Sequence, residues 1–142
     1  MRYLLGIDCG TSGTKTVLFD ESGNAVCSAS AEYPLYQPQN GYAEQDPNDW
    51  KNAMLDTVCR VIGKSGIDGA DIAGIGLSGQ MHGLVMLDEG GNVLRNAIIW
   101  CDQRTGRQVE KMNSLGADRI SEISANPPLK KGISTLNFYL KF

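Results

Sequence analysis

Residues 3–20 hold two short apolar runs that are joined by a turn of glycines and hydroxyl side chains. The first run spans residues 3–7 and the second spans residues 16–19. Apolar runs of this length, bounded by glycine, are typical of buried strands. The sequence therefore predicts a β-hairpin near the N-terminus whose tip is small, polar and rich in glycine.

The tip of this predicted hairpin has the residue types of a phosphate-binding turn. Gly10 and Gly13 leave room for a ligand near the backbone and allow positive φ angles, and successive N–H groups in such a turn can bind an anion. Asp8 lies where the first strand ends, and Lys15 lies where the second begins. Because Mg²⁺ prefers a carboxylate beside a phosphate site, we hypothesise a nucleotide phosphate site in which Asp8 faces the metal.

The same turn has a purely structural interpretation. Gly-Thr-Ser-Gly turns are common in hairpins, and an aspartate that ends a strand is often only a turn residue. The stretch is not a Walker A loop, in which Gly-Lys-Ser/Thr opens a helix, because Gly13 is followed by Thr14 and a second predicted strand. The residue pattern alone leaves both interpretations open.

Three stretches together resemble the FGGY family of carbohydrate kinases, members of the actin, hexokinase and Hsp70 superfamily. Residues 6–15, Gly-Ile-Asp-Cys-Gly-Thr-Ser-Gly-Thr-Lys, resemble the first phosphate motif of that family. Residues 41–50 resemble the segment that enters its first helix, and residues 79–83, Gly-Gln-Met-His-Gly, resemble its xylulose kinase branch. The resemblance runs in order from residue 3 to residue 126.

The resemblance implies an α/β fold, namely an incomplete RNase H-like lobe in which helices flank a mixed sheet. Residues 1–126 are then the first part of the N-terminal kinase lobe. Residues 127–142 are an atypical tail, truncated or poorly ordered, that only half matches the family pattern.

The remaining elements are predicted from periodicity and from capping residues. Asp46 and Pro47 begin a helix that carries one apolar stripe and that Gly63 and Gly66 end. The other predicted elements are an antiparallel strand over 25–31, an extended loop over 33–45, a strand over 72–77, a hairpin over 84–94, a short buried strand over 97–100, and two helical pieces between 102 and 124 that break at Gly116.

The predicted strand over 72–77 brings a second group of residues toward the phosphate turn. Ligands in open α/β sheets bind at the carboxyl ends of parallel strands. If this strand is parallel to the first one, Asp8 and residues 80–82 share one cleft. The strand ends at Asp8, Gly79 and Trp100 are then expected along one edge of the sheet.

The resemblance assigns the sugar contacts to this second group. Met81 offers an adaptable apolar wall and His82 offers a donor or acceptor for a hydroxyl, while Trp100 packs on the carbon face of the sugar. The full set of expected sugar contacts is Gln80, Met81, His82, Trp100, Asp102 and Arg104. Three of these have ordinary structural alternatives: His82 as a hydrogen-bonded turn residue, Asp102 as a helix cap and Arg104 as a solvated surface charge.

The resemblance implies ATP-dependent phosphorylation of a sugar, with D-xylulose converted to D-xylulose 5-phosphate. The expected cofactors are ATP and Mg²⁺, held by Asp8, Gly10, Thr11, Ser12, Gly13 and Lys15. The family's catalytic aspartate, second phosphate motif and adenosine motif have no counterpart before Phe142, so the chain alone is expected to be inactive. The alternatives are gluconate or another sugar as substrate, or a non-catalytic half-lobe that binds sugar or a partner chain.

Composition and sequence patterns limit which binding partners and which cellular location we expect. The formal net charge of −3 gives no reason to expect nucleic acid or an anionic membrane as a partner. No apolar run approaches the length of a membrane span, no signal-peptide pattern is present, and the four cysteines show no metal-type spacing. We expect a cytoplasmic protein that self-associates if the face meant for a second lobe is exposed.

Overall fold

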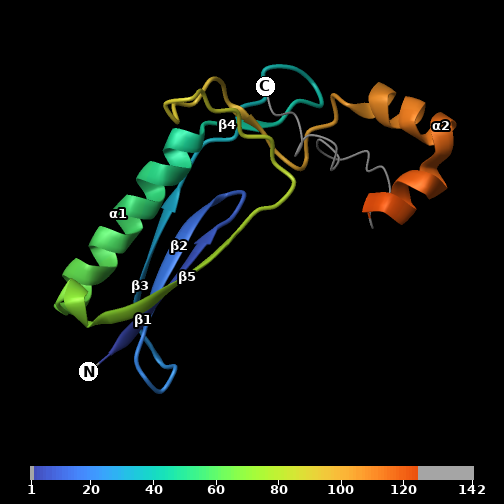
Figure 1. Cartoon of the computed structure of the whole chain (residues 1–142). Helices are drawn as coiled ribbons and strands as arrows, with labels where there is room; N and C mark the ends of the chain where they lie inside the picture. The colour runs from blue at the N-terminus through green and yellow to red at the C-terminus, as the bar shows by residue number, and fades with distance from the viewer. Residues whose placement is uncertain (1, 125–142) are drawn as a thin grey trace. The chain divides into compact units, whose positions relative to one another are not determined.

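The computed structural model describes residues 2–124 (Figure 1). The chain divides into two compact units, which are described separately. The first comprises residues up to Pro34 together with Pro47–Gln80, and the second comprises Leu35–Asp46 together with the residues from Met81 onward. The predicted tail over 127–142 lies outside the described residues.

A four-stranded mixed sheet forms the first unit. Its strands are β1 (Tyr3–Cys9), β2 (Gly13–Phe19), β3 (Ala25–Glu32) and β5 (Ile72–Gly79), in the order β3-β2-β1-β5. β2 is antiparallel to both β1 and β3, whereas β5 is parallel to β1. The predicted N-terminal hairpin, the third strand and the parallel pairing of the fourth are all confirmed.

Helix α1 (Pro47–Ser65) covers one face of this sheet and packs on β2 and β3 (Figure 1). Leu5, Ile7 and Leu18 point to this face, where they form a core with Ala29 and Val61. Along α1 the buried side chains are Ala53, Thr57 and Val61, which confirms the predicted stripe. The hydroxyls of Thr16 and Thr57, both fully buried, lie 2.7 Å apart and satisfy each other inside the core.

The ends of α1 are partly as predicted. The helix begins at Pro47, where a missing N–H does no harm in the first turn. Gly63 lies inside the helix rather than at its end, so that part of the prediction is wrong. Gly66 does end it: its φ is +67°, and its N–H donates to the carbonyl oxygen of Ile62 at 3.1 Å. Only the second glycine stands where the left-handed conformation is needed.

The second unit contains a short two-stranded sheet. β4 (Glu44–Gln45) pairs antiparallel with β6 (Ala97–Ile98), and Leu84 also bridges to Ile98. The prediction that the strand over 97–100 ends at the edge of the main sheet is therefore wrong, as is the wholly extended loop over 33–45. Two-residue strands are too short to show an alternating pattern, so the sequence could not reveal this pairing.

The other elements follow the prediction with smaller differences. The hairpin expected over 84–94 is reduced to an isolated bridge between Leu87 and Val93. A short 3₁₀ turn, η1 (Gly69–Asp71), precedes β5. Helix α2 (Gly106–Ser124) is interrupted at Gly116, where φ is +132°, as the predicted break requires.

Gly13 is needed for the pairing of β2 with β3, and its replacement gives a first testable prediction. A Cβ on Gly13 would lie 2.5 Å from the carbonyl oxygen of Ala31. We expect Gly13→Ala to destabilise the chain by about 1–3 kcal/mol, because the strands must shift apart, as measured by urea unfolding. The control is Gly63→Ala, in the interior of α1 with open space around it, which should be neutral or slightly stabilising. Equal stability of the two variants would contradict this account of Gly13.

Candidate functional site

The turn between β1 and β2 is held together by its own backbone. The N–H of Gly10 donates to the carbonyl oxygen of Gly13 at 3.0 Å. Within residues 2–124 neither Gly10 nor Gly13 has a positive φ, so that prediction is wrong. Glycine is needed at position 13 because a Cβ there would collide with the carbonyl oxygen of Ala31, as described above. A Cβ on Gly10 would approach the Gly13 carbonyl oxygen to 3.4 Å. Since the Gly10 amide is used inside the turn, amide contacts to a phosphate have to come from Thr11, Ser12 or Gly13.

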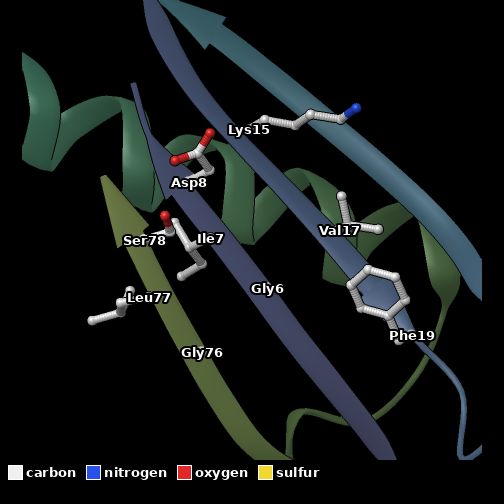
Figure 2. A pocket seen from close by; sticks show the side chains of 9 residues that line it. All are labelled: Gly6, Ile7, Asp8, Lys15, Val17, Phe19, Gly76, Leu77 and Ser78. Carbon is white, nitrogen blue, oxygen red and sulfur yellow. The ribbon is translucent and has the colours of Figure 1, made fainter. Parts of the chain in front are cut away.

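Asp8 and Lys15 are cross-strand partners next to this turn. Both side chains are exposed and lie on the face of the sheet away from α1 (Figure 2). In the part of the chain that the structure describes, the Asp8 carboxylate and the Lys15 ammonium make no hydrogen bond or salt bridge. An uncommitted carboxylate beside an uncommitted cation is suited to a metal ion and to the anion that the metal accompanies.

A shallow hollow of about 420 Å³ lies beside Asp8 on the same face (Figure 2). Gly6 and Gly76, which are register partners on β1 and β5, form its floor because neither carries a side chain. Asp8, Lys15 and Ser78 line one end of it. The hollow leaves room for a ligand against the Asp8 side of the sheet.

Any magnesium ion at this site would have Asp8 as its protein ligand. Among the described residues no group of three or more histidine, cysteine, aspartate or glutamate side chains is arranged to hold a metal ion. Mg²⁺ tolerates this, because it commonly binds through one or two carboxylates and takes its other ligands from water and substrate phosphates. The residues present therefore fit Mg²⁺ bound together with a polyphosphate.

Gln80 was expected to contact the sugar, but the structure places it beside the turn between β1 and β2. Its backbone N–H donates to the carbonyl oxygen of Cys9 at 2.9 Å. Its side-chain Oε1 accepts a hydrogen bond from the Thr11 hydroxyl at 3.3 Å. Gln80 therefore connects the end of β5 to the turn that follows β1.

Tyr33 is a residue of this site that the sequence did not reveal. It follows β3, is 9% exposed, and its hydroxyl donates a hydrogen bond to the carbonyl oxygen of Gly10. Burial raises the pKa of the Tyr33 phenol, a hydrogen bond with Thr14 opposes the rise, and the nearby Cys9 and Asp8 add to it. The phenol is thus kept as a protonated donor at neutral pH. The only available signal was an aromatic residue at the end of an alternating strand.

Met81, His82 and Trp100 all belong to the second unit, next to the bridge between Leu84 and Ile98. Leu84 and Ile98 exchange two backbone hydrogen bonds, at 2.8 and 3.2 Å. This pairing is an isolated bridge, which His82 precedes in a bend and Trp100 follows in a turn. Met81 is 72% exposed and Trp100 is 39% exposed, so large side chains are available to a ligand here.

His82 has an unusual backbone. Within residues 2–124 it is the one non-glycine residue with a positive φ, at +61°. Non-glycine residues in this region are uncommon and cluster at ligand clamps and active sites. Histidine adopts this conformation more often than most residues do, so the backbone alone leaves both the ligand-binding role and the turn role of His82 open.

Asp102 and Arg104 lie in a buried ion network. The carboxylate of Asp102, 1% exposed, accepts hydrogen bonds from the amide of Ala43 at 2.7 Å and from the amide and guanidinium of Arg104. Arg104 also contacts Glu44 at 2.6 Å and lies over the ring of Tyr42. Burial alone would raise the pKa of Asp102, but the hydrogen bonds from Arg104 and Ala43 outweigh it and lower that pKa.

This network decides between the two interpretations of Arg104. Arg104 is not a solvated surface charge, because its side chain is 16% exposed and bonded to two carboxylates. Arg95 reaches the same Glu44 oxygen at 2.6 Å. The network connects β4, which carries Glu44, to the residues that follow Trp100. It therefore stabilises the fold of the second unit.

Comparison with known proteins identifies the family of this chain. The N-terminal domain of the FGGY family of carbohydrate kinases matches residues 3–134. The xylulose kinase of Bacillus subtilis (strain 168) is 42% identical over 92% of the chain, which covers 26% of that enzyme. A ligand-bound xylulose kinase from Lactobacillus acidophilus superposes with a TM-score of 0.79 at 38% identity, covering 86% of this chain and 24% of that one.

A gluconate kinase from Lactobacillus acidophilus is equally similar, with a TM-score of 0.79 and 38% identity over 85% of this chain and 24% of its own. The chain belongs to the FGGY family of carbohydrate kinases, which are phosphotransferases. It has their fold, resembles xylulose kinases, and spans about a quarter of the length of the curated relatives that it matches. Of the described helices, none has the length and apolar character that a bilayer crossing requires.

Proposed function

We propose that this chain is part of an ATP-dependent kinase that phosphorylates D-xylulose to D-xylulose 5-phosphate. The observation that carries the proposal is the exposed, uncommitted Asp8 beside the glycine-rich turn, in a chain that matches a xylulose kinase over 92% of its length. Gluconate as the substrate is the second candidate, because a gluconate kinase is as similar in structure as a xylulose kinase.

In this proposal the phosphate turn positions the nucleotide. Mg²⁺ bound with ATP neutralises charge on the phosphates, which is one of the main requirements of phosphoryl transfer. Asp8 holds the metal, and Thr11, Ser12, Gly13 and Lys15 face the phosphates. Gly10 contributes the shape of the turn, because its amide is used inside it.

The sugar is held by residues of the second unit in this proposal. His82 bonds a sugar hydroxyl, and Met81 and Trp100 pack against its carbon atoms. That these residues share a cleft with Asp8 stays a prediction, since the two groups belong to separate units. The isolated chain is expected to bind ligands without turning them over.

The substrate is tested by titrating D-xylulose and D-gluconate into the chain by calorimetry. We expect D-xylulose to bind more tightly, and His82→Ala to weaken its binding about tenfold through loss of a hydrogen bond and of the strained loop conformation. The control is Gln103→Ala, an exposed residue of the same unit, which should leave the affinity unchanged. Tighter binding of D-gluconate would favour the second candidate, and no effect of His82→Ala would remove His82 from the sugar site.

A further inference from the structure

The hydroxyl of Tyr33 is a buried side-chain donor that reaches the backbone of the turn between β1 and β2. Tyr33 lies 23 residues from Gly10 in the sequence. It is packed beside Thr14 and Cys9, on the face of the sheet that α1 covers. Asp8 and Lys15 lie on the opposite face. Tyr33 therefore contacts the turn from the side away from the proposed ligand.

The bond from Tyr33 fixes the orientation of one peptide group. Gly10 C=O and Thr11 N–H belong to the same planar, trans peptide, so they point in opposite directions. Because the Tyr33 hydroxyl holds the Gly10 carbonyl on its own side, the Thr11 N–H is directed away from Tyr33. The bond from Gly10 N–H to the Gly13 carbonyl oxygen keeps the preceding peptide in place as well.

Gln80, which directly follows β5, restrains the same turn. It accepts from the Thr11 hydroxyl and donates to the carbonyl of Cys9. With Tyr33 on one side and Gln80 on the other, the residues on both sides of the Gly10–Thr11 peptide are anchored. A preorganised donor binds an anion more tightly than a mobile one, because less ordering is required on binding.

We propose that Tyr33 is a positioning residue for the phosphate turn, which holds the Gly10–Thr11 peptide so that the Thr11 N–H faces a bound polyphosphate. It touches no ligand and acts only through the turn. This inference rests on the proposed function for the identity of the ligand, but its structural half concerns the turn alone.

The test uses Tyr33→Phe, which removes the hydroxyl and keeps the ring. Amide hydrogen exchange of the ligand-free chain, followed by NMR, should be faster at Gly10, whose N–H is bonded inside the turn, and unchanged in β1 and β5. The affinity for Mg²⁺-tripolyphosphate, measured by calorimetry, should fall about three- to tenfold, as expected for the loss of one hydrogen bond. The matched control is Tyr36→Phe, a tyrosine that is 41% exposed, which should change neither quantity.

Amide exchange and ligand affinity together distinguish failure of this proposal from failure of the proposed function. Unchanged exchange at Gly10 in a folded Tyr33→Phe chain overturns the proposal, as does faster exchange throughout the sheet, which indicates a merely structural role. If the unsubstituted chain fails to bind Mg²⁺-tripolyphosphate, the proposed function fails, while exchange still decides whether Tyr33 orders the turn. Should Tyr33→Phe not fold, Gln80→Leu tests the restraint of the same turn: faster exchange at Gly10 supports it, and unchanged exchange contradicts it.

Discussion

Asp8→Asn is expected to weaken binding of Mg²⁺-tripolyphosphate to the chain by about 100-fold or more. Loss of a group that merely supports a metal ligand already costs about 10–100-fold in affinity, and here the ligand itself is removed. The amide has nearly the same shape, and the carboxylate makes no hydrogen bond or salt bridge with the residues that the structure describes. The thermal unfolding midpoint should therefore stay the same.

The control for Asp8→Asn is Asp56→Asn on the exposed side of α1. Asp56 forms an exposed ion pair with Arg60 at 3.0 Å, and such pairs contribute little. The two variants carry the same charge change and differ only in position. If both weaken binding equally, the effect is one of net charge, and Asp8 is not a metal ligand.

Asp102→Ala is expected to have the largest effect on stability, a loss of about 3–5 kcal/mol in the second unit. Removing one partner of a buried ion pair leaves the other charge uncompensated. Here the guanidinium of Arg104 loses one of its two carboxylate partners and keeps only Glu44, and the amide of Ala43 loses its acceptor at the same time. The free energy of unfolding, measured in urea with Trp100 fluorescence as the probe, checks this.

The pH dependence of the stability lost in Asp102→Ala gives an independent check of the ion network. Because the pKa of Asp102 is lower in the folded chain than the ordinary value of 3.8, its stabilisation is fully present above that value. It is lost as the pH falls through the lower folded pKa. The stability difference between the unsubstituted chain and Asp102→Ala should therefore be constant at neutral pH and shrink in strong acid. A difference that grows on acidification would contradict the network.

The main sheet could be predicted because its residues obey a simple rule. β1 and β2 correspond to two short apolar runs that a glycine-rich turn separates, and Leu5, Ile7 and Leu18 from these runs form the core under α1. Pro47 marked the start of α1. These signals are local, so the sequence contains them in full.

The second unit could not be predicted in the same way. β4 and β6 are two residues long, and their pairing is stabilised by Glu44, Asp102 and Arg104, which are far apart in the sequence. Nothing local distinguishes such an ion network from surface charge. The resemblance to carbohydrate kinases supplied Asp102 and Arg104 as residues of interest, but their partners came from the structure.

The phosphate turn shows both outcomes in one place. Its position between the first two strands was predicted and is confirmed, and its binding of phosphate stays a prediction. The reason for its glycine at position 13 was not predicted, because the close approach of the Ala31 carbonyl oxygen depends on the pairing of β2 with β3. The anchoring of Gly10 by Tyr33 likewise depends on a contact between distant residues.

The central claim is that the turn after β1 binds a polyphosphate with Asp8 holding the metal. The most direct test is an NMR titration of the ¹⁵N-labelled chain with Mg²⁺-tripolyphosphate. The account predicts that the amide signals of residues 8–15 shift together and saturably, that they do not shift in Asp8→Asn, and that the signals of α1 stay in place. Shifts that leave residues 8–15 unchanged, or that are the same in Asp8→Asn, would contradict it.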